Sequence, residues 1–202
     1  YAFSNPRPID VSYGDVKLTA SMTDKGGLVE LADLVLKHGE QNVITGSIGV
    51  ARHDFKEIQI RGDMTLNEFG TNVQPDVILD FRNEKTLVRG DVDAPKIHLR
   101  DFGQDTRLQK LISSLQADFA PVKDTSDEPE KPIDLSGFDL DLRIDLKSLK
   151  SHDTKLAEIK GLVELQNGHL TINNMKGKMS DGALTFDMDF NTSVSPSTLE
   201  TA

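Results

Sequence analysis

The chain contains no cysteine and no tryptophan, and aromatic residues make up only 5% of its 202 residues. The absence of cysteine excludes disulfide bonds, thiolate metal sites and cysteine nucleophiles. No apolar run approaches the length of about 18 residues that a membrane-spanning helix needs. Lysine and arginine number 23 against 33 aspartates and glutamates, which gives a net charge of −10. Because this charge repels phosphate backbones, we expect no binding to nucleic acid.

Most of the sequence alternates between apolar and polar residues. In the segment 138–146 every even position is apolar and every odd position is charged. Successive side chains of a strand point to opposite faces, so this pattern predicts a strand with one apolar and one polar face. The alternation recurs at 16–22, 44–50, 57–64, 159–165 and 184–190, and turn pairs such as Asn167-Gly168 follow some of these segments. These features predict an all-β antiparallel meander, in which the segment 31–37 resembles the segment 172–178.

One segment has helical periodicity instead. Thr106 and Gln109 form a capping-box sequence, and Pro121 ends the pattern. We therefore predict one amphipathic helix over 107–119, with its apolar stripe formed by Leu108, Leu111, Ile112, Leu115 and Phe119. The acidic, proline-containing stretch 121–136 reads as a linker. It divides the chain into a β-sheet module, 1–120, and a second β module, 137–202, that continues the same sheet.

The apolar face of such a sheet exceeds what one helix can cover. About ten strands at ~4.8 Å spacing give a width on the order of 48 Å, whereas a helix is ~10–12 Å across. Three architectures remain open: a sandwich of two sheets, a closed barrel, or an elongated, curled meander that forms a groove or half-barrel. The aliphatic composition favours the groove, whose apolar lining would be covered by the helix, by neighbouring modules or by lipid.

The region 138–192 resembles a known family. It consists of the alternating strand 138–146, the segment 156–165, the turn Asn167-Gly168 and the sequence Gly182-Ala183-Leu184. This order is similar to the C-terminal region of the AsmA family of bacterial envelope proteins, and residues 85–103 resemble the strand pair that precedes the family's helix. The resemblance implies a periplasmic protein of Gram-negative bacteria, anchored in the inner membrane by an N-terminal helix that this sequence lacks. It also implies a β-groove with a role in outer membrane biogenesis and lipid transport.

On this interpretation the alternating apolar residues line a groove for phospholipid acyl chains. The predicted lining consists of Leu142, Ile144, Leu146, Val163, Leu165, Leu170, Ile172, Leu184, Phe186, Met188 and Phe190. We predict no catalytic residue, no metal and no cofactor, because Asp187 and Asp189 lie on the polar side of their strand and the histidines lack metal-ligand spacing. A β-sandwich binding or scaffold module of an envelope protein is the main alternative, and an enzyme is a third. Exposed terminal strands also favour a homodimer formed by edge pairing.

Overall fold

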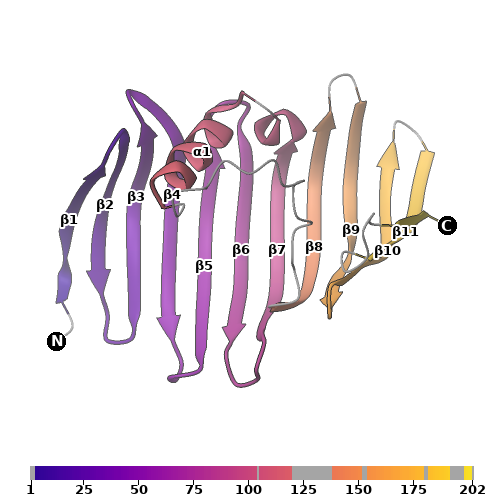
Figure 1. The fold of residues 1–202 in the computed structure, drawn as a ribbon, viewed down its shortest axis with the longest axis horizontal. Helices are drawn as coiled ribbons and strands as arrows, with labels where there is room; N and C mark the ends of the chain where they lie inside the picture. Colours follow the sequence, from indigo (N-terminus) through magenta and orange to yellow (C-terminus); the bar gives the residue numbers. More distant parts are fainter. Residues whose placement is uncertain are drawn as a thin grey trace, which may run out of the picture.

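The computed structural model describes residues 3–103, 105–119, 138–151, 154–179, 182–191 and 198–201. These residues form one open sheet of 12 strands with one 3-10 helix and one α-helix (Figure 1). The elements are β1 (Phe3–Tyr13), β2 (Val16–Asp24), β3 (Leu28–His38), β4 (Gln41–Arg52), β5 (Glu57–Leu66), β6 (Thr71–Asp80), β7 (Thr86–His98), η1 (Leu99–Phe102), α1 (Arg107–Phe119), β8 (Phe138–Ser151), β9 (Thr154–Gln166), β10 (His169–Met179), β11 (Gly182–Asn191) and β12 (Thr198–Thr201).

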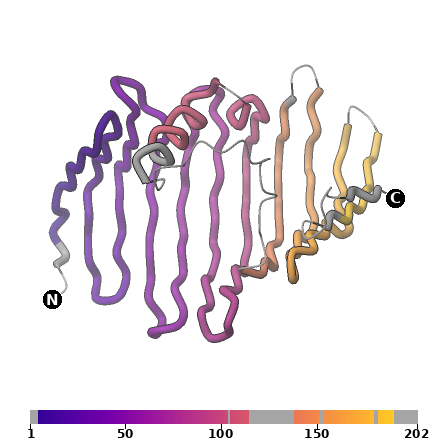
Figure 2. Tube along the Cα trace, viewed as in Figure 1, coloured from indigo at the N-terminus to yellow at the C-terminus, as the bar shows by residue number. Residues whose placement is uncertain are grey.

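The strands lie side by side in the order of the sequence, from β1 to β12, as the trace in Figure 2 shows. This confirms the predicted elongated, curled all-β meander with one helix. Every neighbouring pair is antiparallel except β7 and β8, which pair in parallel with Thr86 beside Phe138. A parallel pair needs a long crossover connection, and here that connection contains α1. The linker predicted at 121–136 lies outside the described residues.

A sandwich and a closed barrel both disagree with this topology. A sandwich needs two sheets packed face to face, whereas all the strands that the structure describes belong to one sheet. A barrel needs its first and last strands to pair, whereas β1 and β12 stand at opposite ends of the strand order.

Three irregular residues keep the apolar side chains of their strands on one face. Asp33, Glu158 and Asn174 have φ angles of 51°, 53° and 53°, and each lies within a strand. At Asn174 the register shifts between Ile172 and Met175, so that both side chains share a face although they are three residues apart. The sequence similarity between 31–37 and 172–178 therefore reflects a β-bulge that recurs in β3 and β10.

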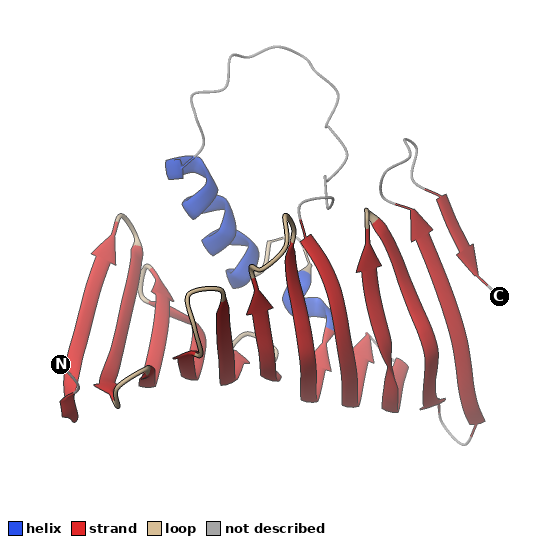
Figure 3. Cartoon of the chain, turned by 90° about the horizontal axis from the view of Figure 1, so that it is seen from below, coloured by secondary structure: helices blue, strands red, loops and turns tan. Residues whose placement is uncertain are grey.

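The helix α1 covers part of one face of the sheet (Figure 3). Its first turn is capped by the Thr106 hydroxyl, which accepts the backbone N–H of Gln109 at 3.2 Å and confirms the predicted cap. Leu108 and Leu111 pack on a small cluster formed by Val16, Leu36, Val43 and Ile44. The strands it contacts most are β3 and β4, so one helix leaves most of this face uncovered, as its width predicts. Within the described ranges, no helix is both long and apolar enough to cross a bilayer.

Candidate functional site: the apolar face

One row of paired residues, apolar at every strand except at Gly90 in β7, crosses the sheet from β3 to β11. Directly paired residues of neighbouring strands point to the same face, so the register identifies the members of this row. We call it the apolar row, and it consists of Val29, Val50, Ile60, Val77, Gly90, Leu142, Val163, Ile172 and Met188. At about 4.8 Å per strand it is on the order of 38 Å long.

All members of the apolar row are half-buried. They pack against one another across the strands and keep part of their surface open. The cluster beneath α1 contains none of them, because α1 packs nearer the opposite ends of β3 and β4. The row is therefore an extended apolar surface that α1 leaves uncovered.

The structure brings the predicted lining residues together. Leu142, Val163, Ile172 and Met188 belong to the apolar row itself. The others lie beside the row on the same face: Ile144 and Leu146 in β8, Leu165 in β9, Leu170 in β10, and Leu184 and Phe186 in β11. Phe190 pairs with Leu170 in β11, but its side chain lies outside the described part. Leu165 is fully buried, so it offers no contact surface to a ligand.

Sequence reasoning missed that this face extends through the N-terminal half. The residues that continue it are Leu18, Leu36, Ile44, Ile58, Met64, Leu66, Leu79, Val88 and Val92. Their alternation was visible at 16–22, 44–50 and 57–64, but the predicted lining was restricted to the region that resembles the AsmA family. The pairing of β7 with β8 joins the two halves into one surface.

The opposite face of the sheet is polar and carries several ion pairs. Arg143 contacts Asp91 at 2.9 Å, and Arg61 contacts Asp76 at 3.1 Å. Lys160 approaches Asp145 at 2.5 Å, and the hydrogen bond and charge of Asp145 raise the pKa of Lys160 above its ordinary value. These exposed pairs contribute little stability, but they hold charge on this face and keep it hydrated.

The polar face also carries an open hollow of about 780 Å³. Its lining includes Asp91 with Arg143 and Asp145 with Lys160, so each of these carboxylates already has a cationic partner. Among the described residues there is no group of three or more histidine or acidic side chains that could hold a metal ion. The apolar face is therefore the stronger candidate for a binding surface.

A buried aspartate holds the N-terminal end of α1 in place. Asp101 in η1 is 1% exposed and accepts the backbone N–H groups of Phe69 and Thr71, both at 3.0 Å. Glu68, in the same turn as Phe69, accepts the backbone N–H of Arg107 at 2.6 Å. The turn between β5 and β6 thus connects to η1 and α1 through two carboxylates, and this connection positions α1 at one side of the apolar row.

Comparison of the chain with protein-family models, curated proteins and solved structures returns no match. The resemblance to the AsmA family therefore stays a prediction from the sequence.

Proposed function

We propose that this chain is a non-enzymatic segment of an AsmA-like periplasmic protein, anchored to the inner membrane, and that it lines a hydrophobic groove for phospholipid transport in outer membrane biogenesis. The apolar row is the observation that supports this proposal most directly. It crosses strands from both halves of the chain with a gap only at Gly90, and its members stay half-buried. Covering such a surface with an apolar ligand removes apolar area from water, and this makes the free energy of binding favourable.

The dimensions of the apolar row suit acyl chains. One leaflet of a bilayer offers an acyl chain about 15 Å of a hydrocarbon core about 30 Å thick. The row, on the order of 38 Å long, exceeds this length, which suits a track along which a chain moves better than a closed pocket. Each methylene group transferred from water to such a surface contributes ~0.8 kcal/mol when fully buried.

The polar face limits lipid binding to one side of the sheet. Its ion pairs stay hydrated while the apolar face takes up hydrocarbon, so lipid binds to one side of the sheet only. The proposed action is non-covalent solvation of acyl chains by aliphatic side chains.

Lipid extraction and mass spectrometry of the purified chain test this proposal. The variant Ile172→Asp places a carboxylate in the middle of the apolar row, where acyl chains would have to desolvate it. We expect its bound phospholipid to fall at least about tenfold relative to the unmodified chain. The matched control is Thr185→Asp, which adds the same charge to an exposed position on the polar face beside Lys176. We expect Thr185→Asp to retain its lipid.

A second measurement does not depend on how Ile172→Asp folds. Phospholipid carrying a photoreactive diazirine in its acyl chain is added to the unmodified chain, and the crosslinked peptides are identified. We expect crosslinks at apolar-row residues of β8 to β11. Crosslinks spread equally over the polar face, or a preparation without any phospholipid, would contradict the proposal and favour a scaffold module.

A further inference from the structure

Three turns lie together at one end of the strands, at the bottom of Figure 1. They connect β2 to β3, β4 to β5 and β6 to β7. Backbone hydrogen bonds tie them together, because the Arg52 N–H donates to the Gly27 carbonyl at 2.9 Å and the Phe81 N–H donates to the Lys56 carbonyl at 2.7 Å. We call the turns 53–56 and 81–85 the aromatic rim.

Each turn of the aromatic rim presents a phenylalanine to solvent. Phe55 is 90% exposed and Phe81 is 42% exposed. Single exposed apolar residues are common on protein surfaces, but here two exposed aromatic residues occupy adjoining turns that are hydrogen-bonded to each other. Neither ring belongs to the apolar face, since both lie beyond the ends of the strands.

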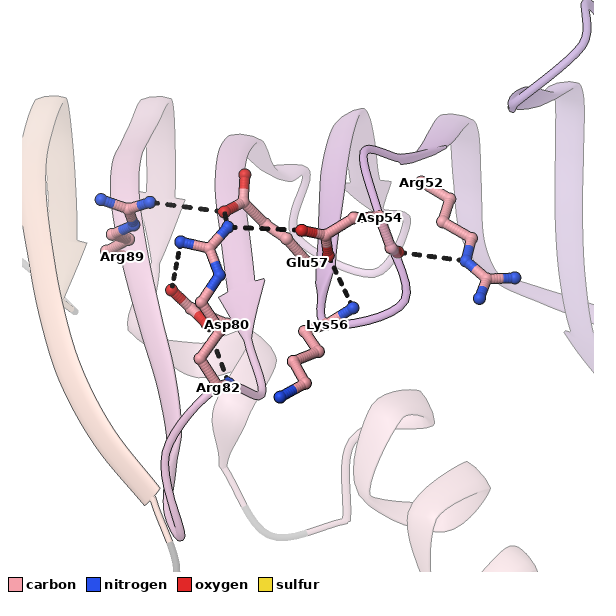
Figure 4. A network of polar contacts seen from close by, with 7 residues as sticks. All are labelled: Arg52, Asp54, Lys56, Glu57, Asp80, Arg82 and Arg89. Carbon is pink, nitrogen blue, oxygen red and sulfur yellow. Dashed lines mark hydrogen bonds and ion pairs between the residues drawn. The ribbon is translucent and has the colours of Figure 1, made fainter.

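Arg82 engages the carboxylate of Asp54 in the aromatic rim and those of Glu57 and Asp80 beside the rim (Figure 4). The Arg82 guanidinium lies 2.5 Å from Glu57 and 3.6 Å from both Asp54 and Asp80. Arg89 also approaches Glu57, at 3.7 Å. A hydrogen bond from the Lys56 backbone and the charge of Arg82 hold the pKa of the Asp54 carboxyl below its ordinary value. This network links both turns and brings two arginines to three carboxylates.

One cation lies over the Phe55 ring, and a second, Lys56, follows it in the chain. The Arg52 guanidinium lies over the Phe55 ring, 4.2 Å from its centre, and its Nε donates to the Asp54 carbonyl. In the part of the chain that the structure describes, no carboxylate forms an ion pair with Arg52 or with Lys56. The exposed ring therefore has one positive charge over its face and a second on the next residue of the chain.

We propose that the aromatic rim binds an anionic lipid surface. Phe55 and Phe81 enter the boundary between headgroups and acyl chains, and Arg52 and Lys56 meet the lipid phosphates, an arrangement in which aromatic rings and cations are favoured at membrane interfaces. The net charge of −10 opposes this approach for the chain as a whole. From Asp24 to Leu28, Arg52 to Glu57 and Asp80 to Thr86, however, basic and acidic side chains are equal in number, so these turns carry no net charge that would repel an anionic surface.

The proposal concerns a different surface from the apolar row, so its test leaves that row unchanged. Because the chain lacks tryptophan, a single Phe55→Trp substitution supplies a unique fluorophore. We expect its emission to shift to shorter wavelength when vesicles of equal parts phosphatidylcholine and phosphatidylglycerol are added, and the shift to diminish with salt. The control is Phe102→Trp in η1, which is 54% exposed at the opposite ends of the strands and should not shift.

Vesicle flotation provides the quantitative test. We expect the double variant Phe55→Ser/Phe81→Ser to lower the partition coefficient at least about tenfold, which corresponds to about 1.4 kcal/mol, and Phe102→Ser to leave it unchanged. Three results would overturn the proposal: no flotation of the unmodified chain with anionic vesicles, equal flotation of the double variant, or equal binding to pure phosphatidylcholine. Self-association that the double variant abolishes without any vesicle present would assign the rim to a protein contact instead.

Discussion

The substitution Asp101→Asn tests whether a single carboxylate positions α1 beside the apolar face. Both oxygens of Asp101 are in use, one accepting the N–H of Phe69 and the other the N–H of Thr71, in a site that is 1% exposed. Asparagine has almost the same shape but offers only one acceptor. Its amide nitrogen must face one of the two N–H donors, and that donor then has no partner.

The expected cost follows from these two bonds. A hydrogen bond to a charged acceptor contributes about 1.5–3 kcal/mol, and a buried N–H without a partner costs about 1–3 kcal/mol. The bond that survives becomes a neutral one and is weaker. We therefore expect Asp101→Asn to lower the free energy of opening at this site by about 3 kcal/mol, which is about a hundredfold in the opening equilibrium.

Hydrogen exchange at the Phe69 and Thr71 amides measures this effect directly. Both amides should exchange about a hundredfold faster in Asp101→Asn, and the amides of α1 should also exchange faster because Glu68 holds Arg107 from the same turn. The control is Asp105→Asn, an exposed neighbour with a φ of 66° that asparagine tolerates well. If Asp101→Asn and Asp105→Asn exchange at the same rate, the carboxylate does not hold this junction.

Two further predictions concern the sheet itself. Gly90→Ala should lower the free energy of unfolding by about 3 kcal/mol or more, since φ is 142° and a Cβ would lie 2.2 Å from the Asp76 carbonyl oxygen, whereas urea denaturation of Gly49→Ala, with no neighbour closer than 3.7 Å, should show little change. Burial raises the pKa of the Asp76 carboxyl. Hydrogen bonds from Gln59 and Arg61 and the charge of Arg61 together outweigh this effect, so the pKa lies below its ordinary value. The stability that Asp76 contributes is therefore present above about pH 4 and is lost as the pH falls through the lowered pKa. The difference in thermal midpoint between the unmodified chain and Asp76→Asn should shrink from about pH 6 to about pH 2, and a constant difference would contradict this assignment.

The periodicity of residue types was enough to predict most of the strands, the two chemically distinct faces and the one helix, but the terminal strands β1 and β12 were not predicted. Alternation reports the geometry of a strand directly, because each residue points its side chain opposite to the next whatever the strand pairs with. The predicted lining residues share one face for this reason. The helix was equally accessible, since the Thr106 cap and the spacing of Leu108 and Leu111 depend only on residues within one or two turns.

Where the alternation breaks, the sequence was ambiguous and the register resolved it. Ile172 and Met175 are three residues apart, a spacing that puts them on opposite faces of a regular strand. The bulge at Asn174 inserts one residue and returns them to the same face, as the register against Phe186 and Met188 shows. A bulge lies in the pairing of two strands, so it appears only when the partner strand is known.

Contacts between distant segments were beyond the reach of local patterns. Asp101 meets Phe69 across 32 residues, Arg82 meets Glu57 across 25, and β7 pairs with β8 although α1 separates them in the chain. Backbone geometry acts between neighbouring residues and leaves its period in the sequence. The choice of partner depends on the free energy of packing and hydrogen bonding summed over the whole sheet, and no single segment carries that sum.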